Sequence, residues 1–81
     1  MSNGDKYDEA FISTFKIEIK DLKGLKYQDI PFWDSIGHMA LMSALEEVFD
    51  VELDVDDIID FSSYEFGKEI LAKYDVDVST K

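Results

Sequence analysis

The sequence has no cysteine, no arginine and a single proline among its 81 residues. Without cysteine the chain can form no disulfide, offers no thiolate nucleophile and has no sulfur ligand for zinc. Cations are scarce, since eight lysines oppose nineteen acidic residues and leave a net charge of −11. Nucleic acids and anionic membrane surfaces are therefore disfavoured as partners. No apolar run has the ~20 residues of a membrane span, and the first ten residues do not resemble a signal peptide, so we expect a cytoplasmic protein.

The length predicts one domain over residues 1–81 with a small core. Its charge is unevenly distributed, because residues 33–65 hold ten acids and no lysine, whereas residues 1–32 and 66–81 are nearly neutral. Such a segment is either a solvated acidic surface or a docking face for basic partners. The clearing of every cation from 33 residues favours the docking face.

Hydrophobic periodicity predicts an all-α fold, a four-helix bundle with three main helices, one short helix and a long loop between the first and second. The helices are expected at about residues 5–15, 35–49, 55–60 and 63–74. Ser2 or Asn3 is expected to cap the first, and the loop that follows contains Gly24 and Pro31 and should be pinned to the core by scattered apolar residues.

The second helix has a continuous apolar side made of Leu41, Met42, Ala44, Leu45, Val48 and Phe49. Its other side is apolar near the start, at Ile36 and Met39, and acidic further along, at Glu46 and Glu47. For the short helix, Asp54 reads as the N-cap, and the expected inward side is Val55, Ile58 and Ile59.

A capping box at Ser62 and Glu65 is predicted to open the last helix, with an apolar stripe of Phe66, Ile70, Leu71 and Tyr74. Gly67 costs about 1 kcal/mol relative to alanine inside a helix, which predicts the close approach of another helix. The polar tail, residues 75–81, is expected to fray.

Asp34 and Ser35 precede the second helix, and one of them is expected to be its N-cap. Ser35 and His38 lie one turn apart, which raises a serine-hydrolase interpretation. The surrounding Trp-Asp-Ser-Ile-Gly lacks the first glycine of a nucleophile elbow and follows no strand, so that interpretation is disfavoured. His38 is expected to be a half-buried packing residue rather than a base or a ligand, and Met39 and Met42 are typical of a core or a contact surface.

The acidic run at residues 50–57 suggests a calcium loop, which needs glycine at position six and an acid at position twelve. Counting from Asp50 places Val55 and Phe61 there, and counting from Asp54 places Ile59 at position six. Both registers fail, so no specific metal site is predicted.

Asp34-Ser35-Ile36 stands at the start of the second predicted helix, and Leu-Glu-Glu-Val-Phe follows at residues 45–49 before an acidic linker. With this spacing, residues 33–53 resemble the acyl carrier protein family, which has Asp-Ser-Leu or a close variant and then Leu-Glu-Glu-x-Phe. The length, the acidity, the helix count and the long first loop agree with that family over nearly the whole chain.

The resemblance implies that Ser35 is an attachment site and that the chain is not itself an enzyme. A phosphopantetheinyl transferase would attach the 4′-phosphopantetheine of coenzyme A to Ser35, next to Asp34, and the thiol of this arm would carry an acyl group as a thioester. Enzymes that load and transfer the acyl group would make apolar contact with Ile36 and Met39. Their basic patches would bind the acidic residues Asp34, Glu46, Glu47, Asp56 and Asp57. The acyl chain would lie between the helices among Leu41, Leu45, Ile58, Ile59 and Ile70, for which ordinary core packing is the alternative.

Gly37, His38 and Ala40 occupy a turn in which carriers of fatty-acid synthesis usually have acids. The resemblance therefore implies a monomeric carrier dedicated to a specialised fatty-acid-like, polyketide-like or related pathway. An aminoacyl, D-alanyl or peptidyl carrier is an alternative of the same class, and an unmodified acidic adaptor for basic proteins is an alternative of another class.

Overall fold

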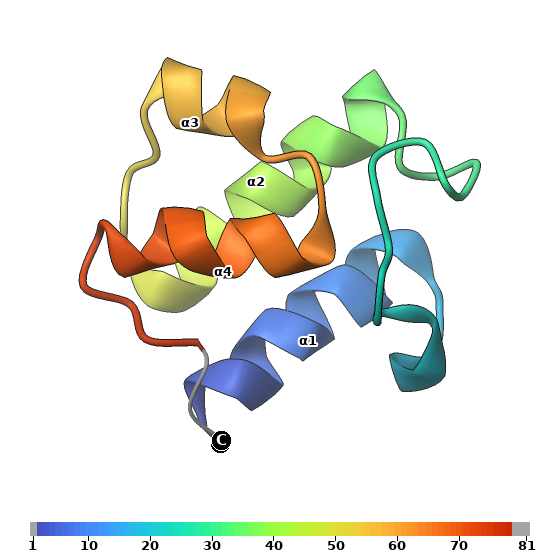
Figure 1. Cartoon of the computed structure of the whole chain (residues 1–81), viewed down its shortest axis with the longest axis horizontal. Helices are drawn as coiled ribbons and strands as arrows, with labels where there is room; N and C mark the ends of the chain where they lie inside the picture. Colours follow the sequence, from blue (N-terminus) through green and yellow to red (C-terminus); the bar gives the residue numbers. More distant parts are fainter. Residues whose placement is uncertain (1, 79–81) are drawn as a thin grey trace.

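The computed structural model describes residues 2–78, which form an all-α bundle as the sequence predicts. Its helices are α1 (Asn3–Phe15), α2 (Ser35–Phe49), α3 (Val55–Asp60) and α4 (Tyr64–Ala72), with one short 3-10 helix, η1 (Ile19–Asp21), in the first loop. In Figure 1, α1 lies at the bottom and α3 at the top, with α2 and α4 between them. None of the helices in this part of the chain is both long and apolar enough to cross a bilayer.

Side-chain caps set the starts of α1 and α4. The hydroxyl of Ser2 accepts a hydrogen bond from the backbone N–H of Asp5 at 3.1 Å, and the carboxylate of Asp5 accepts from the N–H of Ser2, so α1 begins two residues before its predicted start. Ser63 caps α4 by accepting from the N–H of Phe66 at 3.0 Å. The predicted capping box at Ser62 is therefore wrong by one residue, and α4 also ends two residues earlier than predicted.

The core is built around aromatic side chains. Tyr7, Phe11 and Phe15 of α1 are fully buried, and so are Trp33 of the long loop and Phe61 before α4. The Phe11 ring meets the Trp33 ring edge-on at 5.5 Å, and the Phe15 ring stacks on Trp33 at 5.3 Å. Aromatic pairs of this kind contribute about 0.5–1.5 kcal/mol beyond their buried area. The loop thus supplies a central core residue immediately before the start of α2.

The long loop is fastened to the rest of the molecule, as predicted. Leu22 and Leu25 are buried, and the carbonyl of Leu25 accepts from the N–H of Tyr64 at 2.9 Å. The N–H of Tyr27 donates to the carbonyl of Ser62 at the same distance. These bonds hold the loop against the segment that joins α3 to α4.

Gly67 allows a close approach, as predicted, and the structure identifies its neighbours. A Cβ atom at this position would overlap the ring of Phe61 and the hydroxyl of Tyr7. Tyr7 donates to the carbonyl of Tyr64 at 2.6 Å, and the hydroxyl of Tyr64 donates to the carboxylate of Asp8. Burial raises the pKa of both phenols, so both hydroxyls remain donors and tie α1 to α4.

Two predictions near the end of the chain are wrong. Val76 and Val78 are buried, and the side-chain amide of Asn3 donates to the carbonyl of Asp77 at 3.2 Å, so residues 75–78 pack against the start of α1 instead of fraying. Residues 79–81 of the predicted tail lie outside the described residues. Phe66, assigned to the inward stripe of the last helix, is 40% exposed because Gly67 and Ile70 take the buried positions.

Candidate functional site

The start of α2 presents an exposed serine hydroxyl. The carboxylate of Asp34 accepts a hydrogen bond from the N–H of Gly37 at 2.8 Å, so Asp34 is the N-cap. Ser35 is the first residue of the helix, is exposed, and its hydroxyl has no hydrogen-bond partner within residues 2–78. Of the two residues predicted as candidate caps, Asp34 caps the helix, and the side chain of Ser35 is exposed to solvent.

Gly37 sets how closely the long loop approaches this helix start. A Cβ atom there would overlap the carbonyl oxygen of Phe32 and crowd the ring of Phe15. Only glycine leaves room for the loop backbone at this point. Gly37 therefore has a packing role at the start of α2.

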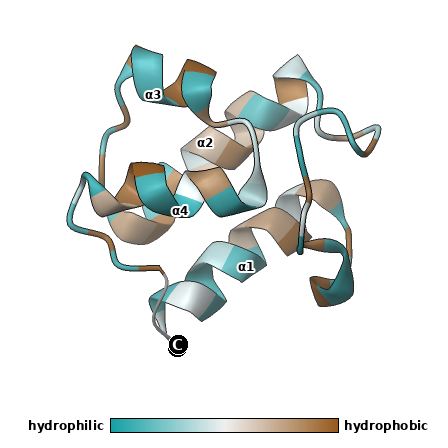
Figure 2. Ribbon diagram, in the orientation of Figure 1, coloured by the Kyte–Doolittle hydropathy of each residue, from teal (hydrophilic) through white to brown (hydrophobic). Residues whose placement is uncertain are grey.

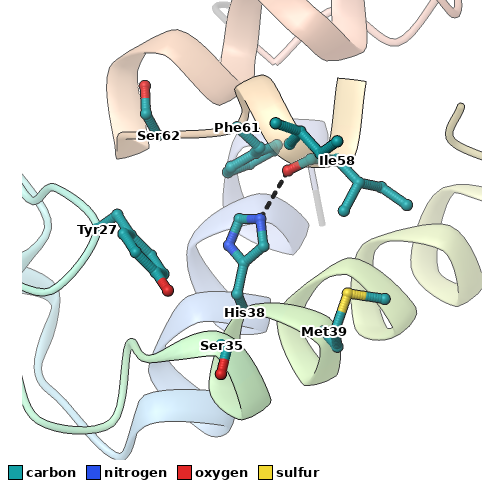
Figure 3. A pocket seen from close by; sticks show the side chains of 8 residues that line it. Tyr27, Ser35, His38, Met39, Ile58, Phe61 and Ser62 are labelled. Atoms are coloured by element: carbon teal, nitrogen blue, oxygen red, sulfur yellow. Dashed lines mark hydrogen bonds between the residues drawn. The ribbon is translucent and has the colours of Figure 1, made fainter. Parts of the chain in front are cut away.

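Ser35 lies at the edge of a groove of about 350 Å³ between α2 and α3. Figure 3 shows the imidazole of His38 rising into this groove from α2, with Tyr27 on one side and Ile58 and Phe61 on the other. Most of the surface is apolar, and the lining residues are Tyr27, Ser35, His38, Met39, Ile58, Ile59, Phe61 and Ser62.

Both ring nitrogens of His38 are occupied. Nδ1 accepts from the indole N–H of Trp33 at 2.9 Å, and Nε2 lies 2.7 Å from the carbonyl oxygen of Ile58 (Figure 3). An indole N–H only donates and a carbonyl only accepts, so these partners select the neutral ring protonated at Nε2. His38 is half-buried, as expected, and makes no hydrogen bond to Ser35, so the pair does not form a nucleophile–base dyad.

The residues predicted to contact partners fall into two groups. Ile36 and Met39 are 81% and 52% exposed, and Glu47 and Asp56 are also exposed, as a docking surface requires. Glu46 is half-buried, and its carboxylate accepts from the N–H of Leu53 at 2.8 Å, which shapes the link between α2 and α3.

Asp57 does not lie on that exposed surface, so its assignment to docking is wrong. It is buried, and its carboxylate accepts hydrogen bonds from Lys73 and Tyr74 at the end of α4. The bond from Lys73, followed by the bond from Tyr74, lowers the pKa of Asp57, and Asp57 in turn raises the pKa of Lys73. The hydroxyl of Tyr74 also accepts from the N–H of Asp54 at 3.0 Å. These contacts fasten the first turn of α3 to α4.

The predicted acyl-binding residues do not meet in one cavity. Leu41, Leu45 and Ile70 are buried in the core and do not line the groove, whereas Ile58 and Ile59 do. The predicted inward side of α3 is wrong for two of its three residues. Val55 and Ile59 are 70% and 72% exposed, and only Ile58 is half-buried. This six-residue helix is held by polar contacts at its ends, so its apolar side chains are not forced inward.

Three residues that line the groove were not predicted from the sequence as site residues. Tyr27 comes from the irregular loop, and Phe61 and Ser62 come from the short link before α4, where no helical period applies. The bond between Trp33 and His38 had no sequence signal beyond their spacing. Within residues 2–78 no group of three or more His, Asp or Glu side chains is arranged to hold a metal ion.

Comparison of the chain with protein-family models, with curated proteins and with solved structures gives no significant match.

Proposed function

We propose that this chain is an acyl carrier protein that bears 4′-phosphopantetheine on Ser35. One observation carries the proposal: the exposed hydroxyl of Ser35, which has no hydrogen-bond partner among residues 2–78, stands at the first position of α2, beside an apolar groove and within the Asp-Ser-Ile motif. In the modification, the hydroxyl oxygen attacks the pantetheine-bearing phosphorus of coenzyme A. A new oxygen–phosphorus bond forms, adenosine 3′,5′-bisphosphate leaves, and the hydroxyl proton passes to a base of the transferase.

The helix start suits the negative charge of the product. The positive end of the α2 dipole lies at Ser35, because this fifteen-residue helix begins there. That end partly offsets the charge of a phosphodiester. The thiol at the far end of the arm then supplies the thiol group that the chain lacks, and it carries the acyl group as a thioester.

The surface around Ser35 suits short-lived contacts with several enzymes. Ile36 and Met39 offer apolar contact beside the arm, while Glu47 and Asp56 offer charge to basic patches on the transferase and on the enzymes that load and unload the acyl group. Charge complementarity of this kind mainly sets the association rate and the choice of partner. A carrier that binds several enzymes in turn needs both properties.

The cargo belongs to a specialised pathway in this proposal, because Gly37, His38 and Ala40 replace the acids usual in fatty-acid carriers. An aminoacyl or peptidyl carrier would bear the same arm on the same residue. Loading of the modified protein by an adenylating enzyme that activates amino acids would select that alternative.

The test is the intact mass after incubation with coenzyme A and a broad-specificity phosphopantetheinyl transferase. We expect wild type to gain the mass of one phosphopantetheine and Ser35→Ala to gain none. Ser62→Ala is the matched control, because Ser62 is also exposed and lines the same groove, and it should be modified like wild type. No gain with several transferases, from protein shown to start unmodified, would overturn the proposal and favour the acidic adaptor.

A further inference from the structure

We propose that His38 limits the length of the cargo and that this carrier takes short apolar acyl groups. This inference rests on the proposed function and concerns the groove beside Ser35. The imidazole closes the inner end of the groove, so an acyl chain that the arm lays in the groove stays between α2 and α3 instead of entering the bundle.

The ring stands between the groove and the aromatic core. On its inner side it lies edge to edge with the Trp33 ring and nearly in the same plane, with 6.3 Å between centroids and 16° between planes. Tyr27 and Phe61 flank it edge-on, at 5.5 and 6.1 Å. The passage from the groove toward the fully buried Trp33 is therefore filled by rings.

Moving this ring aside is costly. The hydrogen bonds to Trp33 and Ile58 would both break, and the fully buried indole would lose its acceptor. A buried donor left without an acceptor loses its hydration and gains nothing in return. Leu41 and Leu45, one and two turns further along α2, are packed with no exposure, so a chain that entered the bundle would also have to separate close-packed side chains.

The outer side of the groove is open and apolar. Met39 is 52% exposed and Ile59 is 72% exposed, so a short acyl group gains by covering them. A longer chain would fill this space and leave its end in water. Within residues 2–78 no carboxylate or ammonium group lines the groove, so an acyl group with a charged end would find no partner among them.

The absence of cysteine allows a test that needs no transferase. In Ser35→Cys, the new thiol is the only one in the chain. Its thiolate attacks an alkyl methanethiosulfonate, a disulfide forms and methanesulfinate leaves. Butyl, octyl and hexadecyl reagents then place chains of increasing length at the edge of the groove.

Methyl and indole NMR signals report where each chain lies, and thermal unfolding reports how much it stabilises the protein. We expect butyl and octyl chains to move the Met39, Ile58 and Ile59 methyl signals and to raise the melting temperature. The hexadecyl chain should raise it no further and should leave the Leu41, Leu45 and Trp33 indole signals in place. Movement of those three signals with His38 present would overturn the proposal.

Two substitutions on the Ser35→Cys background test the role of the ring itself. With His38→Ala, the hexadecyl chain is expected to reach Leu41 and Leu45 and to raise the melting temperature above the octyl value. His38→Gln retains an acceptor and a donor near the ring positions, so it should restore the block. The same length profile in His38→Ala as in the parent would also overturn the proposal.

The outcome is separate from that of the proposed function. Failure of the carrier function appears as a missing mass gain on wild type, whereas failure of the length limit appears in the alkylated Ser35→Cys protein. If His38→Ala does not fold, the octyl–hexadecyl comparison with His38 present still decides the length limit.

Discussion

The two ends of the molecule are held together in different ways. The aromatic side chains of α1, Tyr7, Phe11 and Phe15, are fully buried, whereas α3 exposes about 70% of Val55 and Ile59. Figure 2 shows that α3 contains apolar residues, and two of them, Val55 and Ile59, are exposed, where a helix placed by packing would be polar. Packing energy is thus concentrated around α1 and the aromatic core, whereas α3, which forms one wall of the groove beside Ser35, is held mainly by a few polar contacts. Such regions are the ones that open most readily.

The largest loss of stability is expected from a substitution of Phe11 in the aromatic core. Its ring packs on Trp33 and Tyr64 in the core, so Phe11→Ala should lower the free energy of unfolding by about 3–5 kcal/mol. Ile59→Ala, on the exposed side of α3, should change it by no more than about 0.5 kcal/mol. Urea denaturation measures both, and equal losses would contradict the division between the two ends.

A smaller loss is expected at the junction between the loop and α2. Gly37→Ala forces the carbonyl of Phe32 away and should cost about 1–3 kcal/mol. It should also slow the transfer of phosphopantetheine to Ser35, because the helix start moves. Ser43→Ala, at an exposed position of the same helix, is the control and should leave both quantities nearly unchanged. Normal stability and a normal transfer rate in Gly37→Ala would refute the packing role of the glycine.

The polar fastening of α3 should appear as a pH dependence. The pKa of Asp57 is lower in the folded protein, so its contribution to stability is present above the unfolded value of about 4 and is lost as the pH falls through the folded value. Asp57→Asn should melt at a lower temperature than wild type at pH 7, and this difference should shrink in acid. Asp56→Asn, at the exposed neighbouring position, should show no such change. A difference from wild type that stays constant with pH would exclude the contact between Asp57 and Lys73 as its source.

The smallest effect concerns the acidic surface. Residues 33–65 have a net charge of −10, so added salt should raise the melting temperature by screening their repulsion. The double variant Glu47→Gln with Asp56→Asn removes two exposed charges and should gain less from salt. A melting temperature that does not respond to salt in wild type would argue against strong repulsion there.

The sequence predicted what depends on neighbouring residues. The bounds of α2 and α3 followed from apolar spacing and from acids at the N-cap positions, Asp34 and Asp54, although Asp54 makes no side-chain capping bond. The side that α3 buries did not follow, because six residues make fewer than two turns and the period cannot select one side.

Longer-range contacts were also beyond local patterns. Asp57 is paired with Lys73 and accepts a hydrogen bond from Tyr74, sixteen and seventeen residues away, so its burial had no local signal. The bridge from Trp33 through His38 to Ile58 depends on how α3 lies over α2. Ser35 could be proposed as a site from its motif, whereas the groove beside it required the assembled fold.

The hydrogen bond between Trp33 and His38 also makes the intrinsic fluorescence of the protein sensitive to the groove. Trp33 is the only tryptophan in the chain, and its indole is one hydrogen bond away from the wall of the groove. Any ligand, partner or substitution that displaces the imidazole changes the surroundings of this single fluorophore. Occupancy of the groove can therefore be followed in unlabelled protein, in real time and at low concentration, from its emission alone.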